Sequence, residues 1–140
     1  MVALRRPLVV ILAIALAAAG SGCGKNKEEE ADARRAVNQL YRALGTKDAD
    51  KVCALLSRQG RRELARAAQQ SGGERQSCES LFEFALTFST GLERTADSKV
   101  TDISVSGDEA RAKVKNRREE GDVLLVKEDG AWKLSGLGLD

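Results

Sequence analysis

The hydrophobic pattern of this chain changes period once, and this change constrains the fold more than any other feature. Between Ala31 and Thr90 apolar residues recur every three or four positions, as in a helix with one buried face. After Gly91 apolar and polar residues alternate, as in a half-buried strand. Helices followed by consecutive antiparallel strands predict an α+β fold, in which N-terminal helices pack on one face of a four-stranded antiparallel meander.

Four helical segments are expected before Gly91. They span Ala31 to Leu44, Asp48 to Leu56, Arg61 to Gln70 and Arg75 to Thr90. Asp48 is a good N-cap for the second segment, whereas Ser57 and Gly60 are predicted to interrupt the helix before the third. The last segment carries a broad apolar arc, which predicts burial on most of its sides.

Four strands are expected after Gly91. They span Lys99 to Ser106, Glu109 to Arg117, Asp122 to Glu128 and Ala131 to Leu137. Asp129-Gly130 is a strong signal for a two-residue hairpin turn. On the first strand, Thr101, Ile103 and Val105 are predicted to share one face.

The N-terminus carries a segment typical of exported proteins. Two arginines precede an apolar run from Leu8 to Ala19, which is too short for a membrane-spanning helix. Small residues then lead directly to Cys23, which resembles the lipobox of bacterial lipoproteins, although such boxes usually carry Leu where this chain has Gly20. The resemblance implies that residues 1–22 are a signal peptide and that Cys23 is lipidated. Ordinary cleavage near Ala19, giving a free secreted protein, is the alternative.

The polar residues 23–30 are expected to form a flexible tether between the lipid and a domain that spans residues 31–140. This organisation predicts a protein held on the extracytoplasmic face of the cell membrane, since two acyl chains anchor a protein stably.

Composition argues against several classes of partner. The chain has 23 Lys and Arg against 21 Asp and Glu, and two of the basic residues, Arg5 and Arg6, fall in the signal segment. The remaining charges balance, so we expect no nucleic-acid partner. The chain has no histidine, which is the commonest general base and metal ligand at neutral pH. We therefore expect no metal, no cofactor and no assignable catalytic residue.

The cysteines point to an oxidising compartment. If Cys23 is lipidated, two of the three cysteines remain. An even pair in an exported domain favours a disulfide between Cys53 and Cys78, which would stabilise the fold by about 3 kcal/mol on the chain-entropy model. Two buried free thiols are the alternative.

Three stretches carry a resemblance to a known superfamily. They are the helix Ala33 to Leu44 with its Lys47-Asp48-Ala49-Asp50-Lys51-Val52 continuation, the turn Ser106-Gly107-Asp108-Glu109-Ala110, and the ending Lys127 to Leu134. Together they resemble the nuclear transport factor two-like superfamily, the cystatin-like α+β roll, and in particular its small lipid-anchored actinobacterial members of unassigned activity. The resemblance implies a long helix packed in a strongly bent sheet, the two forming a cone.

Such a cone often leaves a cavity between helices and sheet. The candidates to line an apolar pocket for a small ligand are Tyr41, Phe82, Phe88 and Trp132, with simple core filling as the alternative.

One face of the second strand is expected to be a basic stripe, formed by Arg111, Lys113, Lys115 and Arg117. It could contact anionic lipid or an acidic polymer, or it could be a solvated face paired with Glu119 and Glu120.

These features favour a lipid-anchored binding or scaffolding module at the outer face of the cytoplasmic membrane. The alternative is a small isomerase-like or dehydratase-like enzyme, which would place Tyr41 or a buried acid in a pocket. A homodimer formed through the open face of the sheet, as in many members of the superfamily, is a third interpretation.

Overall fold

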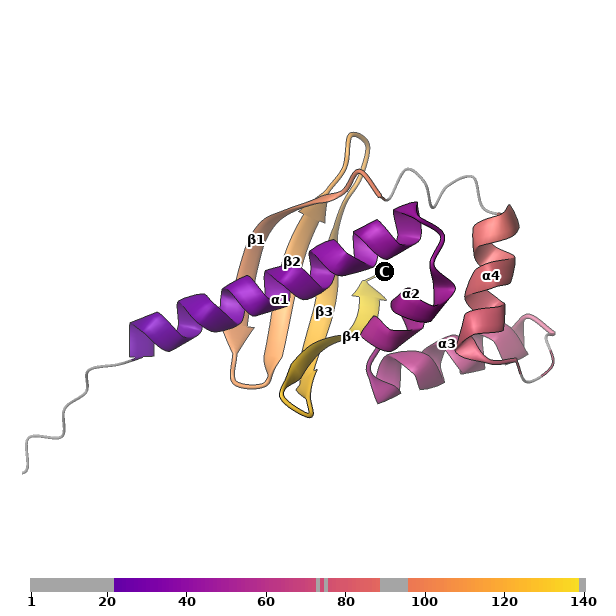
Figure 1. Cartoon of the computed structure of the whole chain (residues 1–140), viewed down its shortest axis with the longest axis horizontal. Coiled ribbons are helices and arrows are strands. Elements are labelled where there is room, and N and C mark those ends of the chain that lie inside the picture. The colour runs from indigo at the N-terminus through magenta and orange to yellow at the C-terminus, as the bar shows by residue number, and fades with distance from the viewer. Residues whose placement is uncertain (1–21, 73, 75, 89–95, 139–140) are drawn as a thin grey trace, which may run out of the picture.

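The computed structural model of the chain describes residues 22–72, 74, 76–88 and 96–138. These residues form four helices and one four-stranded antiparallel sheet, with the helices before the strands (Figure 1). The predicted α+β class is confirmed. The expected signal peptide lies outside the described residues, apart from Gly22. Within the described part, no helix combines the length and the apolar character needed to cross a membrane.

The sheet is an open meander in which each strand pairs with the next one along the chain. Its strands are β1 (Lys99–Ser106), β2 (Glu109–Lys115), β3 (Glu120–Glu128) and β4 (Ala131–Gly138). Gly107 and Gly130 have positive φ in the β1–β2 and β3–β4 turns, a backbone region that glycine enters without steric cost. The four predicted strands are confirmed, with small differences at their ends.

Helix α1 (Gly22–Gly45) crosses one face of the sheet and buries its apolar stripe there (Figure 1). Ala33 and Val37 are fully buried on the helix, and so are Ala112 and Leu134 on the sheet. Strand β2 supplies every second residue to this face, as its alternation of buried and exposed residues shows. The core of the protein is this layer between α1 and the sheet.

Helix α1 begins nine residues before its expected start at Ala31, so the prediction of a flexible tether over residues 23–30 is wrong for this structure. Two physical causes favour the longer helix. After Gly24 the segment is rich in Lys, Glu and Ala, which are good helix formers. In addition, the half-buried Glu29 side chain bonds two residues of the sheet.

Helices α2 (Ala49–Leu55) and α3 (Arg58–Gln70) meet at Ser57. Asp48 caps α2 as predicted, since its carboxylate accepts a hydrogen bond from the Lys51 amide at 3.1 Å. The third helix begins at Arg58 and not at the predicted Arg61, so the break before it is shorter than expected. The Ser57 hydroxyl accepts a bond from the Gly60 amide at 3.0 Å and so acts as the N-cap of α3.

The junction between α2 and α3 is fixed to the β4 edge of the sheet. The Ser57 amide donates to the Leu134 carbonyl at 2.8 Å, and Leu56 forms a parallel bridge with Leu134. Gly60 lies so close to this strand that a Cβ atom there would be 2.8 Å from the Leu134 oxygen. A side chain at position 60 would therefore push α3 away from the sheet.

Helix α4 (Cys78–Phe88) packs against α2 and α3 at the end of the molecule (Figure 1). It begins three residues later than expected, after Ser77, whose hydroxyl accepts from the Ser80 amide at 3.2 Å. The prediction of burial on most sides is wrong. Leu86 is 4% exposed but Phe84 is 65% exposed, because α4 packs on other helices and not in the layer between α1 and the sheet.

The alternation expected for the first strand fails at one point. Ile103 is buried and Val105 is half-buried, but Thr101 is exposed. The register shifts between Val100 and Asp102, and this extra residue turns Val100 toward the core while Thr101 and Asp102 point out.

The contact at Gly60 gives the first testable prediction. Gly60→Ala is expected to lower the free energy of unfolding by about 2 kcal/mol, a typical cost of overpacking, as measured by urea unfolding. Gly136→Ala is the matched control in β4, because a Cβ there meets nothing within 4 Å. Equal stability of the two variants would contradict the close packing of α3 on β4.

Candidate functional site

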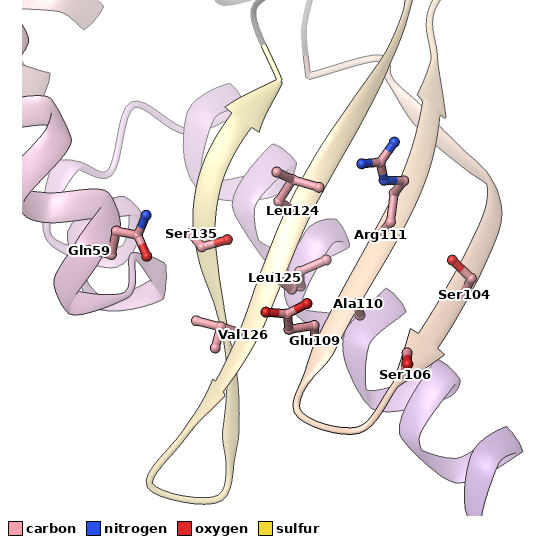
Figure 2. A pocket seen from close by; sticks show the side chains of 10 residues that line it. All are labelled: Gln59, Ser104, Ser106, Glu109, Ala110, Arg111, Leu124, Leu125, Val126 and Ser135. Atoms are coloured by element: carbon pink, nitrogen blue, oxygen red, sulfur yellow. The ribbon is translucent and has the colours of Figure 1, made fainter.

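The sheet face opposite α1, here called the open face, carries a hollow of about 410 Å³. Figure 2 shows this face, with α1 behind the strands. All four strands and the first turn of α3 contribute to the lining of the hollow. The lining residues are Gln59, Ser104, Ser106, Glu109, Ala110, Arg111, Leu124, Leu125, Val126 and Ser135.

The hollow combines aliphatic and polar groups. Leu124 is 37% exposed and the neighbouring Val126 is half-buried. Ser135 lies on the neighbouring strand β4, whereas Ser104 and Ser106 line the hollow from β1, beyond Glu109 and Arg111 of β2 (Figure 2). Such a shallow, mixed surface is typical of sites that contact another macromolecule, since small-molecule sites usually enclose their ligand.

The basic stripe lies on the open face, where Arg111, Lys113 and Lys115 alternate with buried residues. Neighbouring acids neutralise part of it. Arg111 contacts Asp122 at 3.0 Å and Lys115 contacts Glu120 at 4.0 Å, both pairs well exposed. Arg117 follows the end of β2 and is exposed. These contacts favour the solvated-face interpretation over a dedicated anion site.

A second cluster joins the N-terminal part of α1 to the β3–β4 hairpin. The Glu29 carboxylate accepts a bond from Lys127 Nζ at 2.5 Å and another from Trp132 Nε1 at 2.9 Å. The Lys127 ammonium also lies 5.7 Å from the centre of the Trp132 ring, within the range of a cation–π contact. One carboxylate thus connects the helix to two adjacent strands.

The charges in this cluster stabilise one another. The hydrogen bond from Lys127 lowers the pKa of Glu29, and the bond from Trp132 acts in the same direction against partial desolvation. The same pair raises the pKa of Lys127. Both groups are therefore held in their charged forms at neutral pH.

Sequence reasoning missed Glu29, although a signal was present. Counting back from the apolar stripe of α1, Glu29 lies four residues before Ala33 and eight before Val37. The helical period therefore already placed Glu29 on the face that meets the sheet. A polar side chain at the end of that stripe indicates a partner on the sheet.

The four candidate pocket residues lie on three elements. Tyr41 is 7% exposed on α1, Trp132 is 5% exposed on β4, and Phe82 is half-buried against the core from α4. The Phe88 side chain lies outside the described part of the structure. Trp132 bonds Glu29, twelve positions from Tyr41 on α1, a separation of about 18 Å along the helix. This contact places Trp132 beside the N-terminal half of α1, and a pocket shared by the four residues stays a prediction.

Tyr41 behaves as a core residue with one polar partner. Burial raises the pKa of its phenol, and a hydrogen bond with Ser98 partly offsets this rise. Trp132 borders a smaller hollow of about 240 Å³ between α1 and the β3–β4 turn. Neither hollow contains Tyr41. The described residues also form no group of three or more ligands suited to a metal ion.

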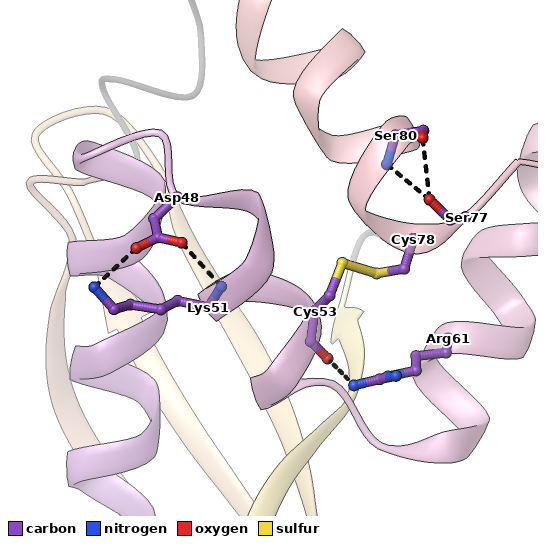
Figure 3. Close-up of a disulfide and its surroundings, with 7 residues drawn as sticks. All are labelled: Asp48, Lys51, Cys53, Arg61, Ser77, Cys78 and Ser80. Carbon is purple, nitrogen blue, oxygen red and sulfur yellow. Dashed lines mark hydrogen bonds and ion pairs between the residues drawn. A yellow bond between two sulfur atoms is a disulfide. The ribbon is translucent and has the colours of Figure 1, made fainter.

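The predicted disulfide between Cys53 and Cys78 is present (Figure 3). It joins the fully buried Cys53 of α2 to the first residue of α4. Arg61 donates to the Cys53 carbonyl at 2.6 Å, and Asp48 and Lys51 form an ion pair at the start of α2 (Figure 3). The disulfide thus attaches α4 covalently to the helices that contact the sheet.

Comparison with models of known protein families finds no match to this chain, and comparison with curated proteins also finds none.

The ion pair at Glu29 predicts a pH-dependent difference in stability. A carboxylate with a lowered pKa stabilises the fold above its unfolded pKa, and this contribution disappears as the pH falls through the lower, folded value. Glu29→Gln should therefore unfold at a lower urea concentration than the wild type at pH 7. Acidification below about pH 4, near the ordinary pKa of Glu, should progressively remove the difference. The control is Glu28→Gln, at an exposed position. An equal loss of stability to urea in this variant would contradict the assignment of the stabilising ion pair to Glu29.

The disulfide predicts a loss of stability on reduction. Closing a loop with a sequence separation of 25 residues is worth about 3 kcal/mol on the chain-entropy model. The double variant Cys53→Ala/Cys78→Ala and the reduced wild type should both lose about this amount in urea unfolding. The reduced wild type keeps the packing of both side chains, so it controls for the cavity that alanine leaves. Unchanged stability in the reduced wild type would contradict the prediction.

Proposed function

We propose that the protein is an exported, lipid-anchored binding module that acts at the outer face of the cytoplasmic membrane. The observation that supports this proposal most strongly is the Cys53–Cys78 disulfide. Such bonds persist in oxidising compartments and are rare in the cytosol. An exported domain explains both the paired cysteines and the signal-like segment before Cys23.

The position of Cys23 supports its role as the anchor. Small residues precede it in the sequence, and α1 begins at Gly22, so the cysteine lies in the first turn of the helix. Cleavage before Cys23 would remove only Gly22 from this helix and leave the rest of the domain intact. The resemblance to small lipid-anchored members of the nuclear transport factor two-like superfamily agrees with this arrangement of helix and sheet.

The open face is the surface that we assign to binding. It carries the hollow of about 410 Å³, with Leu124 exposed beside Val126. A second protein or a second copy of this chain would cover this aliphatic pair. A measurement of molecular size in solution would separate the two, since self-association through the open face would double the mass.

Binding is better supported than catalysis. An isomerase-like or dehydratase-like enzyme needs a positioned acid, base or phenol in a pocket. Tyr41 is the aromatic candidate for that role, but it lies in the core with Ser98 as its partner. The charged groups that line the open-face hollow are Glu109, which is exposed, and Arg111, which is paired with Asp122.

The anchor is tested by fractionating the native host. The wild type should sediment with membranes, whereas Cys23→Ala should be recovered in soluble fractions or remain as an unprocessed precursor of higher mass. The variant Cys53→Ala/Cys78→Ala is the matched control, because it removes two other cysteines and should keep the lipid. Mature Cys23→Ala protein that still sediments with membranes would contradict the proposal.

A further inference from the structure

The helix that carries Cys23 is continuous with the helix that organises the domain. α1 runs without interruption from Gly22 to Gly45 and contains both Cys23 and the buried stripe that starts at Ala33. Glu29 lies six positions after Cys23, which corresponds to about 9 Å of helix. Figure 1 shows the first turns of α1 projecting beyond the sheet.

Contacts at the C-terminal end of this segment restrain the helix. Glu29 bonds Lys127 of β3 and Trp132 of β4. One turn further on, the buried stripe of α1 begins at Ala33 and joins the core that the sheet completes. Two bonds to adjacent strands, followed by the buried stripe, prevent α1 from rotating about its axis relative to the sheet.

The charges between Cys23 and Glu29 suit an anionic lipid surface. Lys25 and Lys27 are exposed in the first turns, ahead of the acidic run at residues 28–30. A basic residue near an anionic bilayer contributes favourable binding energy that falls off within a Debye length. The cations thus lie nearer to the expected lipid attachment than the acids do.

We infer that the first turns of α1 form a rigid spacer between lipid and domain. The spacer would hold the β3–β4 hairpin toward the bilayer, at a fixed distance and in a fixed orientation, with lipid headgroups as its partner. This inference rests on the proposed function, since it takes Cys23 as the site of lipid attachment. A flexible tether would let the domain tumble, whereas a helical spacer presents the open face in a constant direction to a partner.

Energy transfer from Trp132 to the bilayer tests this inference, because Trp132 is the single tryptophan of the chain. The lipidated full-length protein is reconstituted into vesicles that contain dansyl-labelled phosphatidylethanolamine. Two variants carry four extra residues between Lys25 and Asn26, either four alanines or Gly-Ser-Gly-Ser. Four alanines lengthen a helix by about 6 Å and turn it by only about 40°, so they move the domain outward with little rotation.

A rigid spacer predicts a specific order of results. The wild type should give the strongest transfer, with a narrow distribution of donor lifetimes. The alanine insertion should reduce the energy transfer and keep a narrow distribution of donor lifetimes. The Gly-Ser insertion should give a broad distribution of donor lifetimes. Similar broad distributions in all three proteins would overturn the inference, because they would show that the native segment is already flexible.

Hydrogen exchange separates failure of the spacer from failure of the anchor. Co-sedimentation with vesicles reports on the anchor alone. Amide exchange at residues 27–30 of the full chain reports on the helix, whether or not lipid is attached. The wild type and Glu28→Gln should be protected at these amides, and Glu29→Gln should lose protection. Unprotected amides in the wild type would overturn the inference of a rigid spacer even if the protein is anchored.

Discussion

The burial of the α1 stripe against the inner face of the sheet is the interaction on which the rest of the structure depends. A four-stranded meander has one apolar face that needs a cover, and α1 supplies it. Val37 and Leu40 on the helix and Leu125 and Leu134 on the sheet are at most 2% exposed. Full burial of a side chain of this size contributes about 1.5–3 kcal/mol. This layer places the termini of α1 and leaves the other face of the sheet open.

The remaining helices are added at one edge of that layer. Ser57 and Gly60 fit the start of α3 closely against β4, where the missing side chain at position 60 allows the contact. Helix α4 has less contact with the core and is joined to α2 through Cys53 and Cys78. The disulfide stabilises this arrangement because a small domain has a limited core with which to hold an outlying helix.

Much of the fold was predictable because it follows from local pattern. The change of period gave the element types, and Asp48 and Asp129-Gly130 marked a helix start and a hairpin. Features that depend on contacts distant in sequence were missed. The bulge that exposes Thr101 has no local signal in the alternation. Phe84 followed the helical period but is 65% exposed, since periodicity gives the face of a helix and not its position in the fold.

The candidate site also combines features that local sequence predicts with features that depend on contacts distant in sequence. The disulfide was predictable because the cysteine count left one pair once Cys23 was assigned to the lipid. Composition suggested a polar tether over residues 23–30. In the structure Glu29 bonds Lys127 and Trp132, about one hundred residues away in the sequence, and these bonds stabilise the helical conformation of the segment. The hollow of the open face depends on strand register, which places Leu124 opposite Arg111 and Gly136. Residue types alone do not show this arrangement.

In the proposed arrangement, lipid lies at one end of a long helix and a disulfide-supported domain at the other. The intact mass of the protein recovered from membranes of its native host, before and after reduction, tests both the lipid and the disulfide. We predict the mass of residues Cys23 to Asp140 plus the acyl groups of a lipoprotein, with a gain of the hydrogens that reduce one disulfide. An unmodified mature chain without acyl groups, recovered from the medium after cleavage near Ala19, would contradict the account.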